Sequence, residues 1–289
     1  MKEFQDRVAV ATGAASGIGR GLAERFAAEG MKVVLADIEE DALRLAEAEF
    51  REKGADVLGV RTDVSKSEDV EKLAQQTLDA FGAVHIVCNN AGVAGAWGQA
   101  WANTLDDWNW IMGVNLWGVI HGVRTFLPIM LEQGEEGHVV NTASLAGLMP
   151  GRGIYGVTKQ AVVALSESLY NDLKVMNAKI GVSVLCPGWV DTNIIDADRN
   201  RPAELARTVE AIPDAQREQT ETMVRNFLKT GLQPSAVADQ VFEAIRDNNL
   251  YIITHPEMDF IIRERFDNIL ARTNPTPRHV GITRDQPPP

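Results

Sequence analysis

The chain is short of several kinds of residue, and each shortage excludes a class of protein. Its two cysteines, Cys88 and Cys186, lie in apolar stretches, so we expect buried free thiols and neither a disulfide framework nor a metal site. The 28 basic residues are outnumbered by 40 acidic ones, and the net charge of −12 disfavours a nucleic-acid partner. No apolar run reaches 18 residues and no signal peptide precedes the first strand pattern, so we expect no membrane segment and a cytoplasmic location.

What the chain does contain is a regular alternation of two patterns. Apolar, strand-like runs occupy residues 7–12, 32–37, 56–62, 84–89, 137–143, 180–186 and 250–254. Helical patterns of crossover length lie between them, for example Glu40–Lys53 and Lys66–Phe81. This alternation predicts right-handed βαβ units. We therefore predict an α/β fold of the Rossmann type, in which residues 1–273 form one domain around a doubly wound, mostly parallel sheet of seven strands with helices on both faces.

Two segments interrupt the alternation. Residues 192–231 have no strand pattern and follow the sixth strand at the carboxyl end of the sheet, where open α/β folds bind ligands. We interpret this segment as a mobile substrate lid, with a plain surface excursion as the alternative. Residues 274–289 hold five of the 12 prolines, which predicts an extended or flexible tail.

Three glycines, Gly13, Gly17 and Gly19, follow the first strand run and precede a helix pattern. Glycines allow main-chain N–H groups to approach a phosphate closely, and the start of a helix favours negative charge. The turn therefore predicts a dinucleotide site, although a glycine triplet by itself is also compatible with an ordinary tight turn.

Polar residues after the next strands extend this site. Asp37 stands where an acidic residue accepts hydrogen bonds from the adenosine ribose, and its charge would repel a 2′-phosphate, so we expect NAD(H) rather than NADP(H). As an alternative, Asp37 could cap the following helix. Asp63 could accept from the adenine amino group or cap the helix near Lys66, and the sequence favours neither. The run Asn89–Gly92 permits close approach of a cofactor and could link adjacent strands, although by itself it is also compatible with a plain turn.

A tyrosine and a lysine form the candidate catalytic pair. Tyr155 and Lys159 are four residues apart and would share a helix face. A chance pair on a solvated helix is the alternative, which the small number of tyrosines, three in all, disfavours. A neighbouring ammonium lowers the pKa of a phenol from about 10, which makes it a better acid and base. Ser144 ends the fifth strand and could hold a substrate oxygen, or could simply cap a turn. Asn115 lies within a helical pattern and could kink the helix and hold a water molecule.

In combination these residues resemble the short-chain dehydrogenase/reductase family in its single-domain form. The glycine turn matches residues 12–19, the Asn-Asn-Ala-Gly motif matches residues 89–92, and the Pro-Gly motif matches Pro187 and Gly188, with Val190 and Thr192 after it. The family's Asn, Ser, Tyr, Lys tetrad falls on Asn115, Ser144, Tyr155 and Lys159. The likeness extends over residues 6–192 and more weakly to about residue 270. Ser144 precedes Tyr155 by 11 residues, fewer than is common in the family, so we expect a tighter loop between them.

The resemblance implies a role for each of these residues. Tyr155 would exchange the proton of the substrate oxygen, Lys159 would lower the tyrosine pKa and bind the nicotinamide ribose, Ser144 would orient the oxygen, and Asn115 would hold a relay water. The residues it implies for binding NAD(H) are Gly13, Ser16, Gly17, Ile18, Gly19, Asp37, Asp63, Val64, Asn89, Ala91, Gly92, Tyr155, Lys159, Pro187, Gly188, Val190 and Thr192. Family members pair as homodimers or homotetramers through the helices that carry Asn115 and Tyr155.

The same residues predict a reaction and a class of substrate. The expected reaction is hydride transfer between nicotinamide and a secondary alcohol or ketone. Trp97, Trp101, Met149 and Trp189 would line an apolar pocket for a bulky aryl or alicyclic compound, or else belong to the core or an interface. The segment after residue 192 and residues 247–253 are similar to bacterial enzymes that oxidise benzylic alcohols of lignin-derived aryl ethers, while steroid alcohols stay open. A nucleotide-sugar epimerase or dehydratase and a non-catalytic NAD-binding sensor are the alternatives from other classes.

Overall fold

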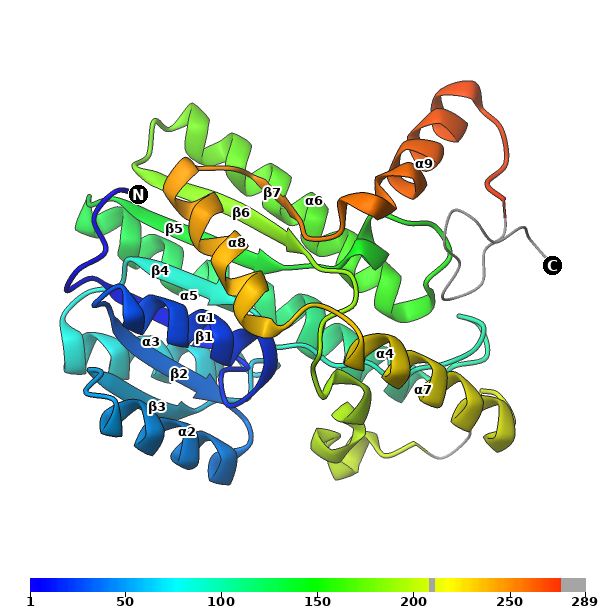
Figure 1. Ribbon diagram of the computed structural model, residues 1–289, viewed down its shortest axis with the longest axis horizontal. Helices are drawn as coiled ribbons and strands as arrows, with labels where there is room; N and C mark the ends of the chain where they lie inside the picture. The colour runs from blue at the N-terminus through cyan, green and yellow to red at the C-terminus, as the bar shows by residue number, and fades with distance from the viewer. Residues whose placement is uncertain (208–210, 277–289) are drawn as a thin grey trace.

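A parallel sheet forms the centre of the molecule. The computed structural model describes residues 1–207 and 211–276. The strands are β1 (Val8–Thr12), β2 (Lys32–Asp37), β3 (Val57–Arg61), β4 (Ile86–Asn89), β5 (Gly137–Thr142), β6 (Ile180–Cys186) and β7 (Tyr251–Ile253). They pair in the order β3-β2-β1-β4-β5-β6-β7 (Figure 1). Every neighbouring pair is parallel, which confirms the predicted seven-stranded sheet.

Helices connect the strands. The longer ones are α1 (Gly17–Ala28), α2 (Glu40–Glu52), α3 (Ser67–Phe81), α4 (Leu105–Met112), α5 (Gly118–Gln133), α6 (Gly153–Val175), α7 (Asp214–Lys229), α8 (Pro234–Asp247) and α9 (Asp259–Ala271). A π turn, η1 (Gly113–Trp117), joins α4 to α5. The short 3₁₀ turns are η2 (Leu145–Gly147), η3 (Ile194–Asn200), η4 (Ala203–Leu205) and η5 (Pro256–Met258).

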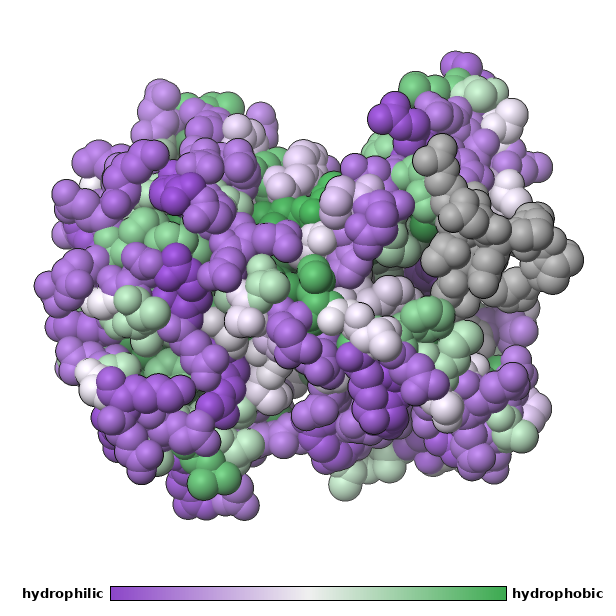
Figure 2. Space-filling view, in the orientation of Figure 1, coloured by the Kyte–Doolittle hydropathy of each residue, from purple (hydrophilic) through white to green (hydrophobic). Residues whose placement is uncertain are grey.

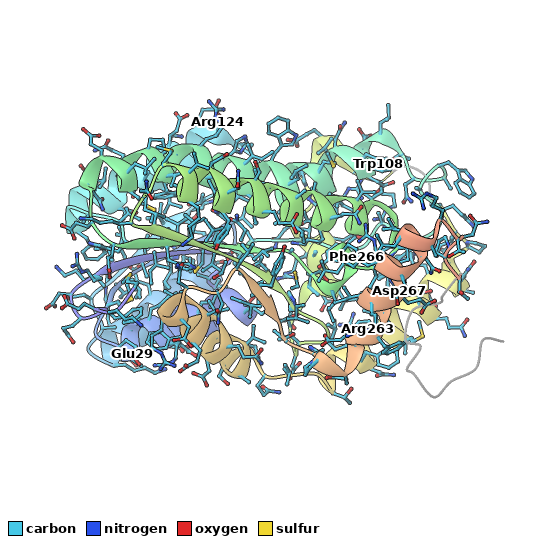
Figure 3. The ribbon with its side chains drawn as sticks, turned by 90° about the horizontal axis from the view of Figure 1, so that it is seen from above. Glu29, Trp108, Arg124, Arg263, Phe266 and Asp267 are labelled. Carbon is cyan, nitrogen blue, oxygen red and sulfur yellow. The ribbon has the colours of Figure 1, made fainter. Side chains whose placement is uncertain are left out.

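Two apolar layers hold the helices on the sheet. On one face, Phe26 of α1 and Phe50 of α2 pack with α8 against β1 and β2. On the other face, Leu73 of α3 and Phe126 of α5 pack with α6 against the same strands and β5. Figure 3 shows the sheet from above between these two groups of helices. The residues pack this way because buried parallel strands are apolar on both faces, and each helix covers one of them.

The strand order determines where a ligand can bind. From β1 the chain crosses to β2 and β3 on one side, and β4 then pairs with the other side of β1. This reversal leaves a crevice at the carboxyl ends of β1 and β4, the usual ligand site of an open α/β sheet. The glycine turn follows β1 and Asn89 ends β4, so both motifs meet at that crevice.

The cysteines and one long helix bear on the predictions from composition. Cys88 and Cys186 are buried free thiols, as predicted. In the described part of the chain, one helical stretch, Leu105–Gln133, is long and apolar enough to cross a membrane, with a mean hydropathy of 1.2. Core helices pass the same test, and α5 within this stretch packs against α3, β4 and β5. We therefore interpret the stretch as part of the folded domain.

The predicted lid is largely helical. It contains η3, η4 and α7, and a bridge between Val190 and Leu232 closes its base. Helix α9 extends away from the body of the molecule (Figures 1 and 2). Its Phe266 and Leu270 side chains are 52% and 75% exposed. The predicted flexible tail lies mostly outside the described residues, which end at Thr276.

Candidate active site

A cavity opens at the crevice between β1 and β4. Most residues predicted to bind the cofactor line it: Gly13, Ser16, Gly17, Ile18, Asp37, Asp63, Val64, Ala91, Gly92, Tyr155, Lys159, Pro187 and Thr192. One end contains the carboxylates that follow β2 and β3, and the other contains Tyr155 and Lys159 of α6. The cavity therefore joins two groups of residues that lie more than 90 positions apart in the sequence.

The turn between β1 and α1 has the geometry of a phosphate site. Gly13 and Gly17 have φ angles of 66° and 54°, which residues with a Cβ rarely adopt. At Gly19 a Cβ would lie 2.2 Å from the carbonyl oxygen of Gly13, so the helix can pack against the turn only because this residue is glycine. Ser16 occupies the N-cap of α1 without a side-chain capping bond. The first turn of α1 can therefore offer main-chain and hydroxyl donors to a phosphate, as a dinucleotide requires.

Two aspartates form the opposite end of the cavity. Asp37 accepts hydrogen bonds from Ala15 N at 2.9 Å and Glu39 N at 3.0 Å. Burial raises the pKa of the Asp37 carboxyl, and these two N–H groups partly oppose the shift. The alternative that Asp37 caps α2 is wrong, because Glu39 occupies that N-cap. Asp63 accepts from the main chain and hydroxyl of Ser65, so it orders the turn before α3 while it also lines the cavity.

The asparagines after β4 link three strands. Asn89 Nδ2 donates to Asn141 Oδ1 of β5 at 2.9 Å. Asn90 donates from its side chain to Thr12 O at 2.9 Å and accepts from Thr142 Oγ1 at 3.2 Å. The predicted role of these residues in joining adjacent strands is confirmed, and Asn90 lines the cavity while Asn89 is buried behind it.

Helix α6 and the end of β5 bring three predicted catalytic residues together. Lys159 Nζ donates to Thr142 O at 2.9 Å and lies 5.7 Å from the centroid of the Tyr155 ring. Ser144 caps η2, where its Oγ accepts from Ala146 N at 3.1 Å, so the predicted turn-capping role of this serine is also observed. The hydroxyl of Ser144 also donates to Pro187 O at 3.4 Å and lies near enough to the phenol of Tyr155 to affect its pKa. A substrate oxygen between them would contact both hydroxyl groups.

The pKa values of this pair differ from the expectation. Burial raises the pKa of Tyr155 to about 12, and the hydroxyl of Ser144 opposes the rise. Burial also lowers the pKa of Lys159 to about 8. The expected lowering of the tyrosine pKa by Lys159 is therefore not found in this arrangement, because removal from water is the largest influence on the phenol.

Asn115 lies in the π turn η1 and is completely buried. Its Oδ1 accepts from Val93 N at 2.8 Å, and its Nδ2 donates to Val93 O at 2.9 Å. The expected disturbance of the helix at this residue is thus observed as one wide turn, a feature that is frequent at functional sites. The side chain itself is used to hold the loop after β4.

The loop between Ser144 and Tyr155 is compact, as its length predicts. After η2, Gly151 and Gly153 adopt positive φ angles of 73° and 55°. A Cβ at Gly147 would lie 2.6 Å from Lys159 O, so this glycine lets the loop pack directly on α6. The short spacing is therefore accommodated by close packing of main chain on main chain.

Four residues predicted to bind the cofactor lie behind the cavity wall rather than in it. These are Gly19, Asn89, Gly188 and Val190. Gly188 makes room for His255, whose Nδ1 would lie 2.7 Å from a Cβ at this position, and Val190 pairs with Leu232. These residues support the wall of the cavity, and their predicted contact with the cofactor stays a prediction.

The predicted aromatic pocket is wrong in part. Trp101 is 86% exposed, and Met149 packs in an apolar cluster between α6 and α9. Trp97 and Trp189 pack with Ile195 and the α7 side of the lid, where Trp189 stacks on Phe227 at 5.0 Å. These two tryptophans therefore belong to a small core beneath the lid, the alternative left open by the sequence.

Sequence reasoning missed several residues of the cavity wall. Ile194, Ala197, Arg199 and Asn200 come from η3 of the lid, and Trp110 comes from α4. No periodic pattern marks the lid residues, and the fold alone places them over the cavity. Arg199 donates to Glu39 at 2.5 Å and thereby attaches the lid to the end of β2.

Comparison with known proteins agrees with this geometry. The short chain dehydrogenase family model matches residues 7–203, and the chain belongs to the short-chain dehydrogenase/reductase family of oxidoreductases. It is 35% identical over 274 residues to the CLA biosynthesis dehydrogenase/reductase of Lactiplantibacillus plantarum, covering 94% of this chain and 96% of the relative. It is 34% identical over 277 residues to C alpha-dehydrogenase of a Sphingobium species, covering 95% of this chain and 89% of the relative.

A solved structure is similar over almost the whole chain. It is a short-chain dehydrogenase/reductase from Burkholderia phymatum in complex with NAD, with a TM-score of 0.93 and 46% identity, covering 96% of this chain and 99% of that one. The family resemblance drawn from the motifs is thereby confirmed, and the fold places those motifs around one cavity.

Proposed function

We propose that this protein is an NAD(H)-dependent oxidoreductase that transfers a hydride between nicotinamide and a secondary alcohol or ketone. The observation that carries the proposal is the cavity with a carboxylate, Asp37, at one end and Tyr155 and Lys159 at the other. The carboxylate favours NAD(H), because a 2′-phosphate beside Asp37 would be repelled. The Burkholderia phymatum structure, which contains NAD, supports the same choice.

The residues of this chain supply proton transfer and orientation, while a bound nicotinamide supplies the hydride chemistry. Tyr155 carries its proton at neutral pH and can donate it to a carbonyl oxygen or, as the phenolate, accept it from an alcohol. Ser144 holds the same oxygen beside the phenol. Lys159 is fixed by Thr142 O next to the Tyr155 ring, where it would bind the nicotinamide ribose. Asn115 positions the loop that includes Gly92 and so shapes the reacting end of the site.

The substrate class that we propose is a bulky aryl or alicyclic secondary alcohol, with a steroid or other hydroxy compound as the alternative. The likeness of residues 192–231 and 247–253 to enzymes acting on benzylic alcohols supports it. Relatives named C alpha-dehydrogenase and 1-deoxy-11-beta-hydroxypentalenate dehydrogenase support a substrate larger than a simple aliphatic alcohol. Trp110 of α4 and Ile194 and Ala197 of the lid line the cavity and would give such a substrate an apolar border.

We also propose that the enzyme is a cytoplasmic homodimer or homotetramer. Free buried thiols suit a reducing compartment. Trp117 of η1 and Val157 of α6 are each 49% exposed, and their helices carry Asn115 and Tyr155. Pairing through these helices would cover both side chains, and Val157→Asp should shift the protein toward monomer in analytical ultracentrifugation.

A screen of secondary alcohols tests the proposed reaction. Aryl and steroid alcohols are offered with NAD⁺ or NADP⁺, and formation of the reduced cofactor is followed at 340 nm. We expect turnover with a bulky alcohol and NAD⁺, and its loss in Tyr155→Phe. Turnover restricted to small aliphatic alcohols would refute the substrate class, and unchanged turnover in Tyr155→Phe would refute the mechanism.

A further inference from the structure

The charges around the cavity are unevenly distributed. Among the described residues that line it, Asp37, Glu39 and Asp63 are acidic, whereas Lys159 and Arg199 are the cations. The protein as a whole carries a net charge of −12. Lys159 is buried beside Tyr155 and donates to Thr142 O, so it belongs to the reacting end. Of the two cations that line the cavity, Arg199 is therefore the one at its acidic end, and the cavity must accept a doubly charged diphosphate.

The lid carries Arg199 across this cavity. At the start of the lid, Thr192 Cγ2 would lie 3.1 Å from a Cβ at Gly17, so the chain leaves the sheet directly over the glycine turn. At the end of η3, Arg199 and Asn200 both donate to Glu39 Oε1, at 2.5 and 2.7 Å. The segment between them thus extends from the predicted phosphate site to the end of β2.

The guanidinium of Arg199 is held in place yet accessible. Nη2 donates to Glu39 and Nη1 donates to Asp196 O at 2.8 Å. Burial raises the pKa of Glu39, but the hydrogen bonds from Arg199 and Asn200 outweigh this and lower it, so the pair is charged at neutral pH. The Arg199 side chain is nevertheless 40% exposed. A guanidinium has five donors, so it can hold one carboxylate and bind a second anion at the same time.

We propose that Arg199 is a cofactor-binding residue, whose guanidinium binds the diphosphate of the dinucleotide while Glu39 holds it over the cavity. The inference rests on the proposed use of NAD(H). In this way the lid has a role in cofactor binding besides covering the substrate, because Arg199 belongs to the lid and its contact with Glu39 attaches it to the end of β2.

The chain offers matched variants for the test. Arg199→Gln removes the cation, and Glu39→Gln removes the charge of its partner but keeps a side-chain oxygen that can still accept from Arg199. Arg225→Gln is the control, because Arg225 of α7 also pairs with a lid carboxylate, Asp196 at 2.8 Å, but does not line the cavity. Affinities are measured by displacement of NADH fluorescence with two probes, ADP and adenosine, which differ only in the diphosphate.

We expect Arg199→Gln to weaken ADP and NADH binding by about tenfold, the usual effect of one charge-assisted hydrogen bond, and to leave adenosine within twofold of the wild type. Added salt should weaken ADP binding less in this variant than in the wild type. Glu39→Gln should change the affinity for ADP less than threefold, Arg225→Gln should change neither affinity, and Arg199→Lys should recover part of the loss.

Two results would overturn the inference. One is an Arg199→Gln variant that binds ADP with the affinity of the wild type. The other is an Arg199→Gln variant whose affinities for ADP and adenosine fall by the same factor, which would show that Arg199 has only a structural role. The proposed function fails separately, if the wild-type protein binds NADPH but not NADH. In that case NADPH replaces NADH as the displaced probe, and the comparison of ADP with adenosine still decides the role of Arg199.

Discussion

The side chain of Asn115 forms two hydrogen bonds with the main chain of one residue, Val93, at 2.8 and 2.9 Å. This pair joins the π turn of the long helix to the loop after β4. Gly92 in that loop leaves room for both Asn115 Oδ1 and Lys159 Nζ, each 3.4 Å from the place of a Cβ. Asn115 therefore acts on the catalytic end by positioning main chain, and its amide is already used.

Loss of this contact should destabilise the fold. In Asn115→Ala the N–H and C=O of Val93 lose their partners in a buried place, which costs roughly 2–4 kcal/mol of unfolding free energy. Urea denaturation followed by circular dichroism measures the change. Asn103→Ala, which removes a hydrogen bond at an exposed position, serves as the control and should cost less than about 0.5 kcal/mol. Equal stabilities of the two variants would contradict the structural role.

Tyr155 should give the reaction its pH dependence. Its pKa of about 12 means that the phenol is protonated at neutral pH. The phenolate needed to oxidise an alcohol is then scarce. As long as the pH is below that pKa, each unit of increase in pH raises the phenolate fraction about tenfold. We expect the rate of alcohol oxidation to rise between pH 6 and 8, and Tyr155→Phe to lower kcat by roughly 10²- to 10⁴-fold without loss of NADH binding. An oxidation rate independent of pH would contradict this assignment.

Asp37 should set the choice of cofactor. Asp37→Asn removes the charge that repels a 2′-phosphate, while an amide oxygen can still accept from Glu39 N. We expect the ratio of NADPH to NADH affinity to increase by about tenfold or more. Asp63→Asn, which removes a second carboxylate from the cavity wall, is the control and should leave this ratio unchanged. Fluorescence titration with both cofactors makes the comparison.

Gly147 should be intolerant of any side chain. A Cβ there would lie 2.6 Å from Lys159 O and 3.0 Å from Gln160 N, which are main-chain atoms of α6. Gly147→Ala is expected to cost about 1–3 kcal/mol of stability and to lower kcat, because the loop from Ser144 to Tyr155 must move away. Gly113→Ala would place its Cβ 3.5 Å from Ser65, an ordinary contact, and should be tolerated. Thermal unfolding and steady-state rates would reveal the difference, and equal behaviour would argue against it.

His138 should make the protein sensitive to acid. Burial lowers its pKa from 6.5 to about 3, and its Nε2 is hydrogen-bonded to Ser183 Oγ at 2.8 Å. Between these two pKa values the unfolded chain binds a proton that the folded protein does not, so stability falls as the pH drops below 6.5. The loss from this group at pH 5 is about 2 kcal/mol. His138→Gln should reduce the difference in unfolding free energy between pH 7 and pH 5 by that amount, and an unchanged difference would exclude His138 as its source.

The local patterns of the sequence were sufficient for the sheet, the glycine turn and the grouping of Ser144, Tyr155 and Lys159. Apolar strand runs and helix spacing reflect interactions between near neighbours in the chain, so they can be identified from the sequence before the fold is known. The carboxylate after β2 could also be predicted, because strands in a parallel sheet bring their carboxyl ends to one edge.

The tertiary structure decided the rest. Contacts between segments far apart in the chain decide three features that no local pattern indicates. These are the exposure of Trp101, the position of Asn89 behind the cavity wall and the contact of a lid residue with Glu39. The same holds for the pKa values of Tyr155 and Lys159, since burial sets them and burial is a property of the packed molecule. The sequence by itself determined which chemical groups are present and on which strand ends they stand. Only packing determined how far each is removed from water and which of them meet.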